Sequence, residues 1–415
     1  MTSPELATSS PVRYHGLDAL RGIAMLLGIV IHAALPYIPD IKEFWPPDKE
    51  SSQLISVIFH FIHMWRMPLF FIMAGFFSCL IVTRKSWKNW WGNRLLRIAI
   101  PIVVFTPIMS ATLPWIFAYG RTGEIEIFYS RDGEPHHLWF LWQLIIFALF
   151  TVLMGPFNLL WKLMIRSRNK KPDIVCENCK KENLFGSGYC AYCGFLIDTS
   201  LNTVKKILTS IFLTSRFPIG FIIICVVAGI WGWGELHVNP IASGLFFLFG
   251  YILYKNKPLL SFMKSYWMFY LLVASIVFVM NLILMDIDIK KIPAKEDAEF
   301  IQGLQYLTKM ICTVLFCYSL IGLAEDKLGS YNPTLRLISD GSYWIYLIHL
   351  PIVTFMTFMM FGWPIPVEIK FLLAIIVTSA ICLITYIYLV RFTLIGVLLN
   401  GKRYSRKTVP NRVNP

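Results

Sequence analysis

Ionisable side chains inside apolar stretches are the residues of this 415-residue chain whose types and spacing could do chemistry. Charge is expensive at membrane depth, so such groups usually have a function. Neutral imidazole can act as a general base near pH 7, and planar guanidinium groups match phosphate oxygens. The candidate catalytic residues are His32, His63 and His349, and the candidate anion-binding residues are Arg21, Arg66, Arg94 and Arg97.

Each candidate also has a purely structural interpretation. Arg21, Arg94 and Arg97 could anchor helix ends at lipid headgroups, and each lone histidine could be a hydrogen-bonded residue of a helix bundle. Arg66 lies too deep in its apolar stretch to reach an interface easily, which favours a binding role or a buried pair. The pair His136–His137 is expected at the membrane surface.

A second constellation lies in a polar stretch near the middle of the chain. Cys176-Glu-Asn-Cys179 is followed, after ten residues, by Cys190-Ala-Tyr-Cys193. Two CxxC pairs at this spacing can hold one tetrahedral Zn²⁺ through four thiolates, and the segment resembles a small zinc ribbon. Because four thiolates complete the coordination shell, the metal would be structural. Free thiols in a reducing loop and a redox role are the alternatives.

The composition defines the elements that must position these residues. The chain is 56% hydrophobic and only 15% charged, and its mean hydropathy is +0.61. These values exclude an ordinary soluble enzyme, a disordered protein and a disulfide-rich secreted module. We therefore predict an all-α polytopic membrane protein with ten transmembrane helices. The predicted spans are 17–35, 54–82, 96–119, 137–161, 217–233, 240–254, 266–285, 300–323, 337–361 and 369–390.

The loop charges predict the orientation. Loops 36–53, 120–136 and 286–299 hold at least as many acids as bases, whereas three of the alternate loops and the C-terminal tail are basic. By the positive-inside rule both termini are cytoplasmic, which agrees with an even number of spans. The net charge of +14 is thereby assigned to topology and anionic lipid rather than to nucleic acid. The basic segments are 83–95, 162–216, 255–265 and the tail from residue 391.

The predicted organisation is one membrane domain in two parts. Residues 1–165 hold the first four spans, and residues 207–395 hold the remaining six. Between them, residues 166–206 form a cytoplasmic insertion whose zinc-ribbon-like core is 174–196. A basic cytoplasmic tail occupies residues 396–415.

Depth along the predicted helices separates the candidates into two groups. At a rise of about 1.5 Å per residue, Arg21 lies roughly 6 Å from the inner edge and His32 roughly 22 Å from it. His63 falls at a similar outer depth, and Arg94 with Arg97 opens the third span at the inner edge. This division fits a phosphate-bearing donor in the cytoplasm and a hydroxyl acceptor at the outer face.

Five short motifs occur in order along the chain. They are Leu17–Ala24 followed by His32, Arg66–Phe76, Arg94-Leu-Leu-Arg97 followed by Pro101, His137–Leu141 and Tyr346–His349. Together they resemble the integral-membrane acyltransferases of acyltransferase family 3, and the glucan-modifying members of that family in particular. The zinc-ribbon-like insertion departs from the usual family pattern.

The resemblance implies transfer of a small acyl group, acetyl or succinyl, from cytoplasmic acyl-CoA. The implied acceptor is a hydroxyl of an extracytoplasmic glycan or glycolipid, and the implied location is the bacterial cytoplasmic membrane. The resemblance also implies that His32 is catalytic and that Arg94 and Arg97 serve the donor.

Further roles follow from the predicted depths. We expect Arg21 to share in binding the CoA phosphates, and Arg66 to orient the thioester or the acceptor. His63 or His349 would assist the catalytic histidine, and direct transfer and relay through an acyl-enzyme both remain open. The expected partners are the acceptor, membrane lipids and a protein that docks on the zinc module.

Two other classes of function compete with this hypothesis. A transporter or flippase of a lipid-linked or acylated sugar would suit the charges at membrane depth and the short fifth and sixth spans. It would release no CoA. A signalling scaffold with the zinc module as its sensor would lose function when residues 172–196 are deleted, while donor turnover persisted.

Overall fold

The computed structural model describes residues 13–39, 41, 45–84, 87–129, 136–149, 151, 174–175, 180, 182–183, 216–231, 239–288, 291–400 and 404. Its helices in the first half are α1 (His15–Ala34), the 3₁₀ turn η1 (Leu35–Tyr37), α2 (Gln53–Arg84), α3 (Trp87–Thr122), the 3₁₀ turn η2 (His136–Leu138) and a short helix over Trp139–Leu149. The helices in the second half are α6 (Ile219–Trp231), α7 (Pro240–Lys255), α8 (Lys257–Met285), α9 (Lys295–Lys327), α10 (Pro333–Met359), α11 (Val367–Thr385), the π-helix η5 (Tyr386–Val390) and α12 (Leu394–Asn400).

Asparagine and proline begin three of these helices. The side chain of Asn239 accepts a hydrogen bond from the Ile241 amide at the start of α7, and Asn332 does the same for two amides at the start of α10. Asn256 caps α8 in the same way. Each asparagine is followed by a proline in the first turn, where the missing N–H costs no intrahelical bond.

Seven helices are long and apolar enough to cross a membrane, which confirms the predicted all-helical membrane class. They are His15–Tyr37, Gln53–Val82, Leu95–Thr122, Lys257–Met285, Lys295–Lys327, Pro333–Met359 and Val367–Val390. The other three predicted spans coincide with shorter apolar helices, Trp139–Leu149, Ile219–Gly229 and Pro240–Lys255. Ten crossings therefore stay a prediction.

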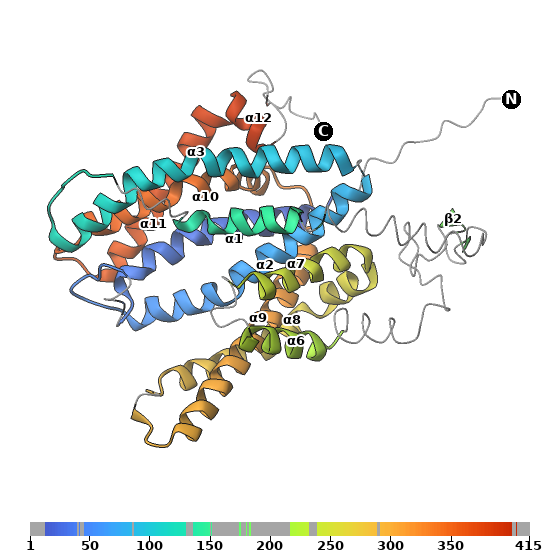
Figure 1. Ribbon diagram of the computed structural model, residues 1–415, viewed down its shortest axis with the longest axis horizontal. Coiled ribbons are helices and arrows are strands. Elements are labelled where there is room, and N and C mark those ends of the chain that lie inside the picture. The colour runs from blue at the N-terminus through green and yellow to red at the C-terminus, as the bar shows by residue number, and fades with distance from the viewer. Residues whose placement is uncertain are drawn as a thin grey trace, which may run out of the picture.

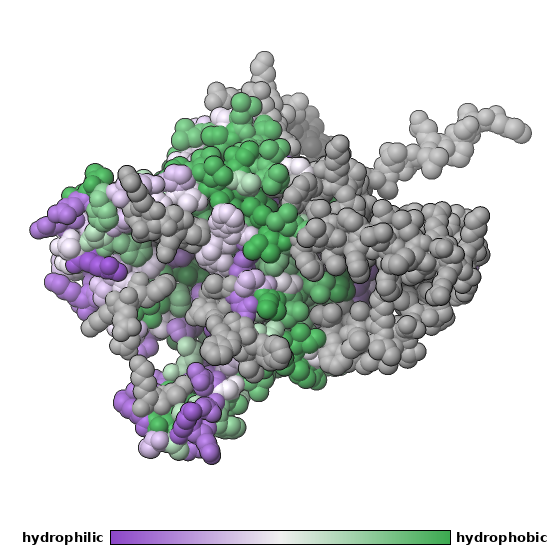
Figure 2. Space-filling model, viewed as in Figure 1, coloured by the Kyte–Doolittle hydropathy of each residue, from purple (hydrophilic) through white to green (hydrophobic). Residues whose placement is uncertain are grey.

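The helices pack around α1 (Figure 1). This helix contacts α2, α9, α10 and α11, and its buried residues include small ones such as Gly22 and Gly28 that admit close neighbours. α8 and α9 form an antiparallel pair that projects from the other helices. Apolar surface crosses the middle of the face drawn in Figure 2, and hydrophilic surface covers the tip of that pair.

The bundle has two ends that differ chemically. At the end where α1 begins, Arg21, Arg97 and Arg336 come together around one cavity, and we name it the arginine end. At the opposite end, the segment Trp45–Ser52 connects to the start of α2, and we name it the loop end. The candidate site lies between them.

The insertion is described only at its edge. β1 (Ile174–Val175) and β2 (Glu182–Asn183) pair antiparallel, with Val175 opposite Glu182. The four cysteines predicted to bind zinc, Cys176, Cys179, Cys190 and Cys193, lie outside the described residues. Among the residues that the structure describes, no three His, Cys, Asp or Glu side chains are grouped in a way that could hold a metal.

Candidate active site

Four polar side chains from four elements meet in the interior of the bundle. The imidazole of His32 on α1 lies 5.3 Å from that of His349 on α10, and the ring of His137 on η2 lies 5.2 Å from His349, centroid to centroid. A Cβ placed on Gly28 would be 2.5 Å from Nη1 of Arg66 and 3.4 Å from Nε2 of His349. The guanidinium of α2 therefore lies beside these rings. We name His32, Arg66, His137 and His349 the histidine centre.

Backbone carbonyls fix the tautomers of two of these histidines. Nδ1 of His349 hydrogen-bonds the carbonyls of Tyr346, at 2.8 Å, and Ile345, at 3.1 Å. A carbonyl only accepts, so Nδ1 carries the proton and the lone pair of the neutral ring is on Nε2. Nε2 of His137 likewise donates to the Tyr346 carbonyl at 2.9 Å. One peptide group thus orients two imidazoles.

The tyrosine of this peptide completes the network. The hydroxyl of Tyr346 donates to the carbonyl of His137 at 2.6 Å, which ties η2 to α10 in both directions. Within the described residues, Nδ1 of His32, Nε of Arg66 and Nε2 of His349 are enclosed and make no hydrogen bond. Groups of this kind point to a ligand that would contact them.

His137 is a member that the sequence interpretation missed. The histidine pair at 136–137 was expected at the membrane surface, but His137 is only 8% exposed and lies beside the middle of α10. Two hydrogen bonds to Tyr346 of α10 hold His137 there, one through its imidazole and one through its backbone carbonyl. The sequence did contain a signal that His137 belongs to the site, because this residue begins the motif His137–Leu141, one of the five motifs.

His63 lies at the margin of the histidine centre. It precedes Arg66 by one helical turn on α2, and its ring stacks on Phe59 with centroids 4.9 Å apart. His63 is among the electrostatic neighbours of His32, together with His349, Arg66 and His137. The predicted assisting histidines are thus both near His32, but only His349 has a ring contact with it.

A cavity of about 300 Å³ opens at the arginine end. Arg21 and Arg97, two of the predicted donor-binding residues, line it together with Arg336. Nη2 of Arg21 donates to Oγ of Ser339 at 3.2 Å and lies 3.5 Å from Asp18. The backbone of Arg94 belongs to α3 one turn before Arg97, and its side chain lies outside the described residues.

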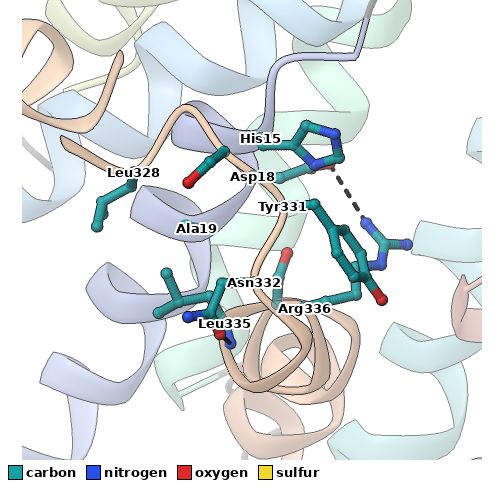
Figure 3. Close-up of a pocket in the computed structure, with 10 residues that line it drawn as sticks. His15, Asp18, Ala19, Leu328, Tyr331, Asn332, Leu335 and Arg336 are labelled. Atoms are coloured by element: carbon teal, nitrogen blue, oxygen red, sulfur yellow. Dashed lines mark hydrogen bonds and ion pairs between the residues drawn. The ribbon is translucent and has the colours of Figure 1, made fainter. Parts of the chain in front are cut away.

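Acidic residues hold two arginines of this cavity, Arg21 and Arg336, in place. Arg336 bridges Asp18, at 3.4 Å, and Asp340, at 2.6 Å, and Asp18 also pairs with Arg13. Figure 3 shows the Asp18–Arg336 pair at a smaller pocket of about 10 Å³, the size of one water molecule. Sequence reasoning missed Arg336 because it stands at the start of a span, where it resembles an interfacial anchor.

The cavity runs inward toward the histidine centre. Its lining includes Met25, one turn before Gly28 on α1, and Phe70, one turn after Arg66 on α2. A ligand whose anionic part contacts the arginines could therefore extend an apolar arm to within about one helical turn, roughly 5 Å, of Arg66.

Comparison with known proteins gives the family. Residues 14–390 match the sequence model of the family 3 acyltransferase domain. Glucans biosynthesis protein C of Salmonella typhimurium is 24% identical over 418 residues, covering 96% of this chain and 98% of that protein. The protein of the same name from Escherichia coli K12 is 32% identical over 152 residues, covering 34% of this chain and 38% of that protein. No solved structure shows a significant match.

The match covers all the helices that build the site. It includes α1 with His32, α2 with Arg66 and α10 with His349, and it confirms the resemblance inferred from the five motifs. The protein is a multi-pass membrane enzyme that transfers acyl groups other than aminoacyl groups. The chain belongs to the family of acyltransferase 3 domain proteins.

Proposed function

We propose that this protein moves a small acyl group, acetyl or succinyl, from cytoplasmic acyl-CoA to a hydroxyl of an extracytoplasmic glycan or glycolipid. One observation carries the proposal: the lining of an arginine-lined cavity at one end of the bundle comes within one helical turn of a buried histidine centre. Guanidinium groups suit the phosphates of CoA, and the apolar inner lining suits the pantetheine arm.

The histidine centre supplies the groups that an acyl transfer needs. His32 removes the proton of the acceptor hydroxyl, whose oxygen attacks the thioester carbonyl carbon. The N–H groups of Arg66 stabilise the negative charge that develops on the carbonyl oxygen. The C–S bond then breaks, and the CoA thiolate takes the proton from His32. His349 assists through Nε2, the nitrogen that carries its lone pair.

The orientation of the protein in the membrane follows from placing the acyl-CoA donor at the arginine end. The arginine end faces the cytoplasm, where acyl-CoA is made, and the loop end faces outward. Ten crossings would then put both termini on the cytoplasmic side of the inner membrane, in agreement with the basic loops. Relatives named for glucan biosynthesis support a glucan as the acceptor.

A labelled donor tests the function. Purified full-length protein in liposomes is given acetyl-CoA or succinyl-CoA with a radioactive acyl group, together with a soluble glucan. We expect equal amounts of free CoA thiol and labelled glucan. Arg97→Gln should raise the KM for acyl-CoA about tenfold, as the loss of one charge-assisted hydrogen bond of about 1.5 kcal/mol implies. A transporter would move sugar without releasing thiol, and that result would refute the proposal.

We also propose that Cys176, Cys179, Cys190 and Cys193 bind one structural Zn²⁺. The pairing of β1 with β2 supports this site, because it brings together Val175 and Glu182, which flank the first CxxC, and Lys180 between them has a φ of +56°. With little apolar core in such a short segment, metal binding would supply most of its folding energy. A folded module could then dock a protein partner.

The metal is expected at about one Zn²⁺ per chain. Cys176→Ser together with Cys179→Ser should release it, because two thiolates alone do not complete the shell. Metal content of the purified protein, measured by mass spectrometry, checks this. Cys382→Ala is the control, since this cysteine is buried in α11. Equal zinc in both variants would contradict the site.

A further inference from the structure

On its loop-end side, His32 of the histidine centre contacts the aromatic side chain of Trp45. The indole of Trp45 is 6% exposed and lies nearly parallel to the His32 ring, at 21° and 6.2 Å between centroids. Its edge packs on Phe117 of α3 at 4.6 Å, and Phe358 of α10 lies 6.3 Å away. Trp45 thus bridges the space between α1, α3 and α10 above the candidate base.

A buried ion pair holds this part of the chain. Nζ of Lys370 on α11 lies 2.9 Å from Oδ2 of Asp48, and the two side chains are 3% and 1% exposed. The Asp48 amide donates to the carbonyl of Pro36 at 2.9 Å, and the Ser52 amide donates to that of Tyr37 at 2.9 Å. The segment Trp45–Ser52 is therefore fastened to η1, the turn that follows α1, and to the start of α11.

A second contact fastens the same segment to α11. Oγ of Ser52 donates to Oε1 of Glu368 at 2.7 Å. A buried ion pair is a costly way to gain stability, because both charges lose their hydration. Its better-attested use is to specify one geometry, and here the geometry is the position of Trp45 over His32.

We propose that Trp45 is a specificity-determining residue that excludes water from His32, and that the Asp48–Lys370 pair holds it in place. The inference rests on the proposed function. In the productive reaction a sugar hydroxyl attacks the thioester carbonyl carbon and the CoA thiol leaves. If water attacks instead, the products are the free carboxylic acid and the same thiol. A thioester that reaches the histidine centre from the arginine end needs protection from water at the loop end.

The indole itself supports this role. Nε1 of Trp45 is enclosed and makes no hydrogen bond among the described residues. A buried indole N–H usually finds a partner, so phenylalanine would fill a simple core position at lower cost. An indole donor beside His32 can instead hydrogen-bond the acceptor oxygen once the sugar is bound.

The exclusion of water by Trp45 is tested by measuring how much CoA thiol is released when no acceptor is present. Wild-type protein in liposomes is given acetyl-CoA with and without soluble glucan, and thiol, free acetate and labelled glucan are measured. Trp45→Ala and Asp48→Asn should each raise acetate formation relative to glucan labelling about tenfold. Trp45→Phe keeps a ring and should stay near wild type in acetate formation. Lys295→Met, which removes an exposed ion pair with Glu299, is the matched control.

The outcomes separate the two proposals. If the wild type labels glucan and neither Trp45→Ala nor Asp48→Asn increases hydrolysis, the proposed role of Trp45 is wrong, whereas the proposed acyltransferase function is supported. If the wild type releases no thiol with any acyl-CoA, the proposed function fails, and the inference falls with it. If Asp48→Asn does not fold, Trp45→Ala decides, because it leaves the buried pair intact.

Discussion

Replacing His32 by alanine should abolish acyl transfer while the protein remains folded. His32 is the imidazole of α1 at the histidine centre, and it is the proposed base. The loss of a positioned general base lowers the rate by about 10² to 10⁴-fold. The KM for acyl-CoA should change little, because the arginines of the donor cavity belong to other helix turns. Transfer of labelled acyl groups to glucan, measured at several donor concentrations, separates these two effects.

His60→Ala is the matched control for this variant. It removes an imidazole from α2 at a similar depth, but this ring contacts Phe59, 5.4 Å away between centroids. Its transfer rate should stay within about threefold of the wild type, which corresponds to less than 1 kcal/mol. Full transfer activity in His32→Ala would overturn the assignment of the base, and full activity in His349→Ala would remove His349 from the mechanism.

Replacing Gly250 by alanine should prevent α7 from packing on α2. A Cβ at this position would lie 1.8 Å from the backbone oxygen of Ile72, and a Cβ at Gly75 would lie 1.9 Å from that of Phe247. Both contacts are with backbone, so no side-chain rotation relieves them. Overpacking typically costs about 1 to 3 kcal/mol, and a clash between two backbones is at the upper end of this range. Because α2 also carries Arg66, displacement of this helix should also reduce transfer.

The melting temperature and the monodispersity of the purified protein in detergent measure this effect. Gly244→Ala changes another glycine of α7 and is the control, because its Cβ would meet only the ring of Phe147 at 3.4 Å. Gly250→Ala should yield little folded protein, whereas Gly244→Ala should purify like the wild type. Equal stability of the two variants would contradict the close crossing of α2 and α7.

Local sequence signals account for much of the site. The motif around His32 and the motif ending at His349 identified two histidines of the centre, and Arg66 was singled out by its depth. These residues are recognisable because a charged or titratable group in an apolar helix has few structural explanations. The place of His137 was not predicted because hydropathy shows where an apolar stretch begins, but does not show that folding buries this side chain against Tyr346 of α10.

The sequence by itself determined the membrane class and the family, and it named most side chains of the candidate site. The reason is that apolar length and short motifs are local properties of the chain. Only the tertiary structure decided which of these side chains meet, because contacts such as His32 with His349, or Lys370 with Asp48, join residues more than 300 positions apart. The tautomers of His137 and His349 were also decided there, since one carbonyl of α10 orients both rings. Likewise, Trp45 acquires a role only when folding places it over His32.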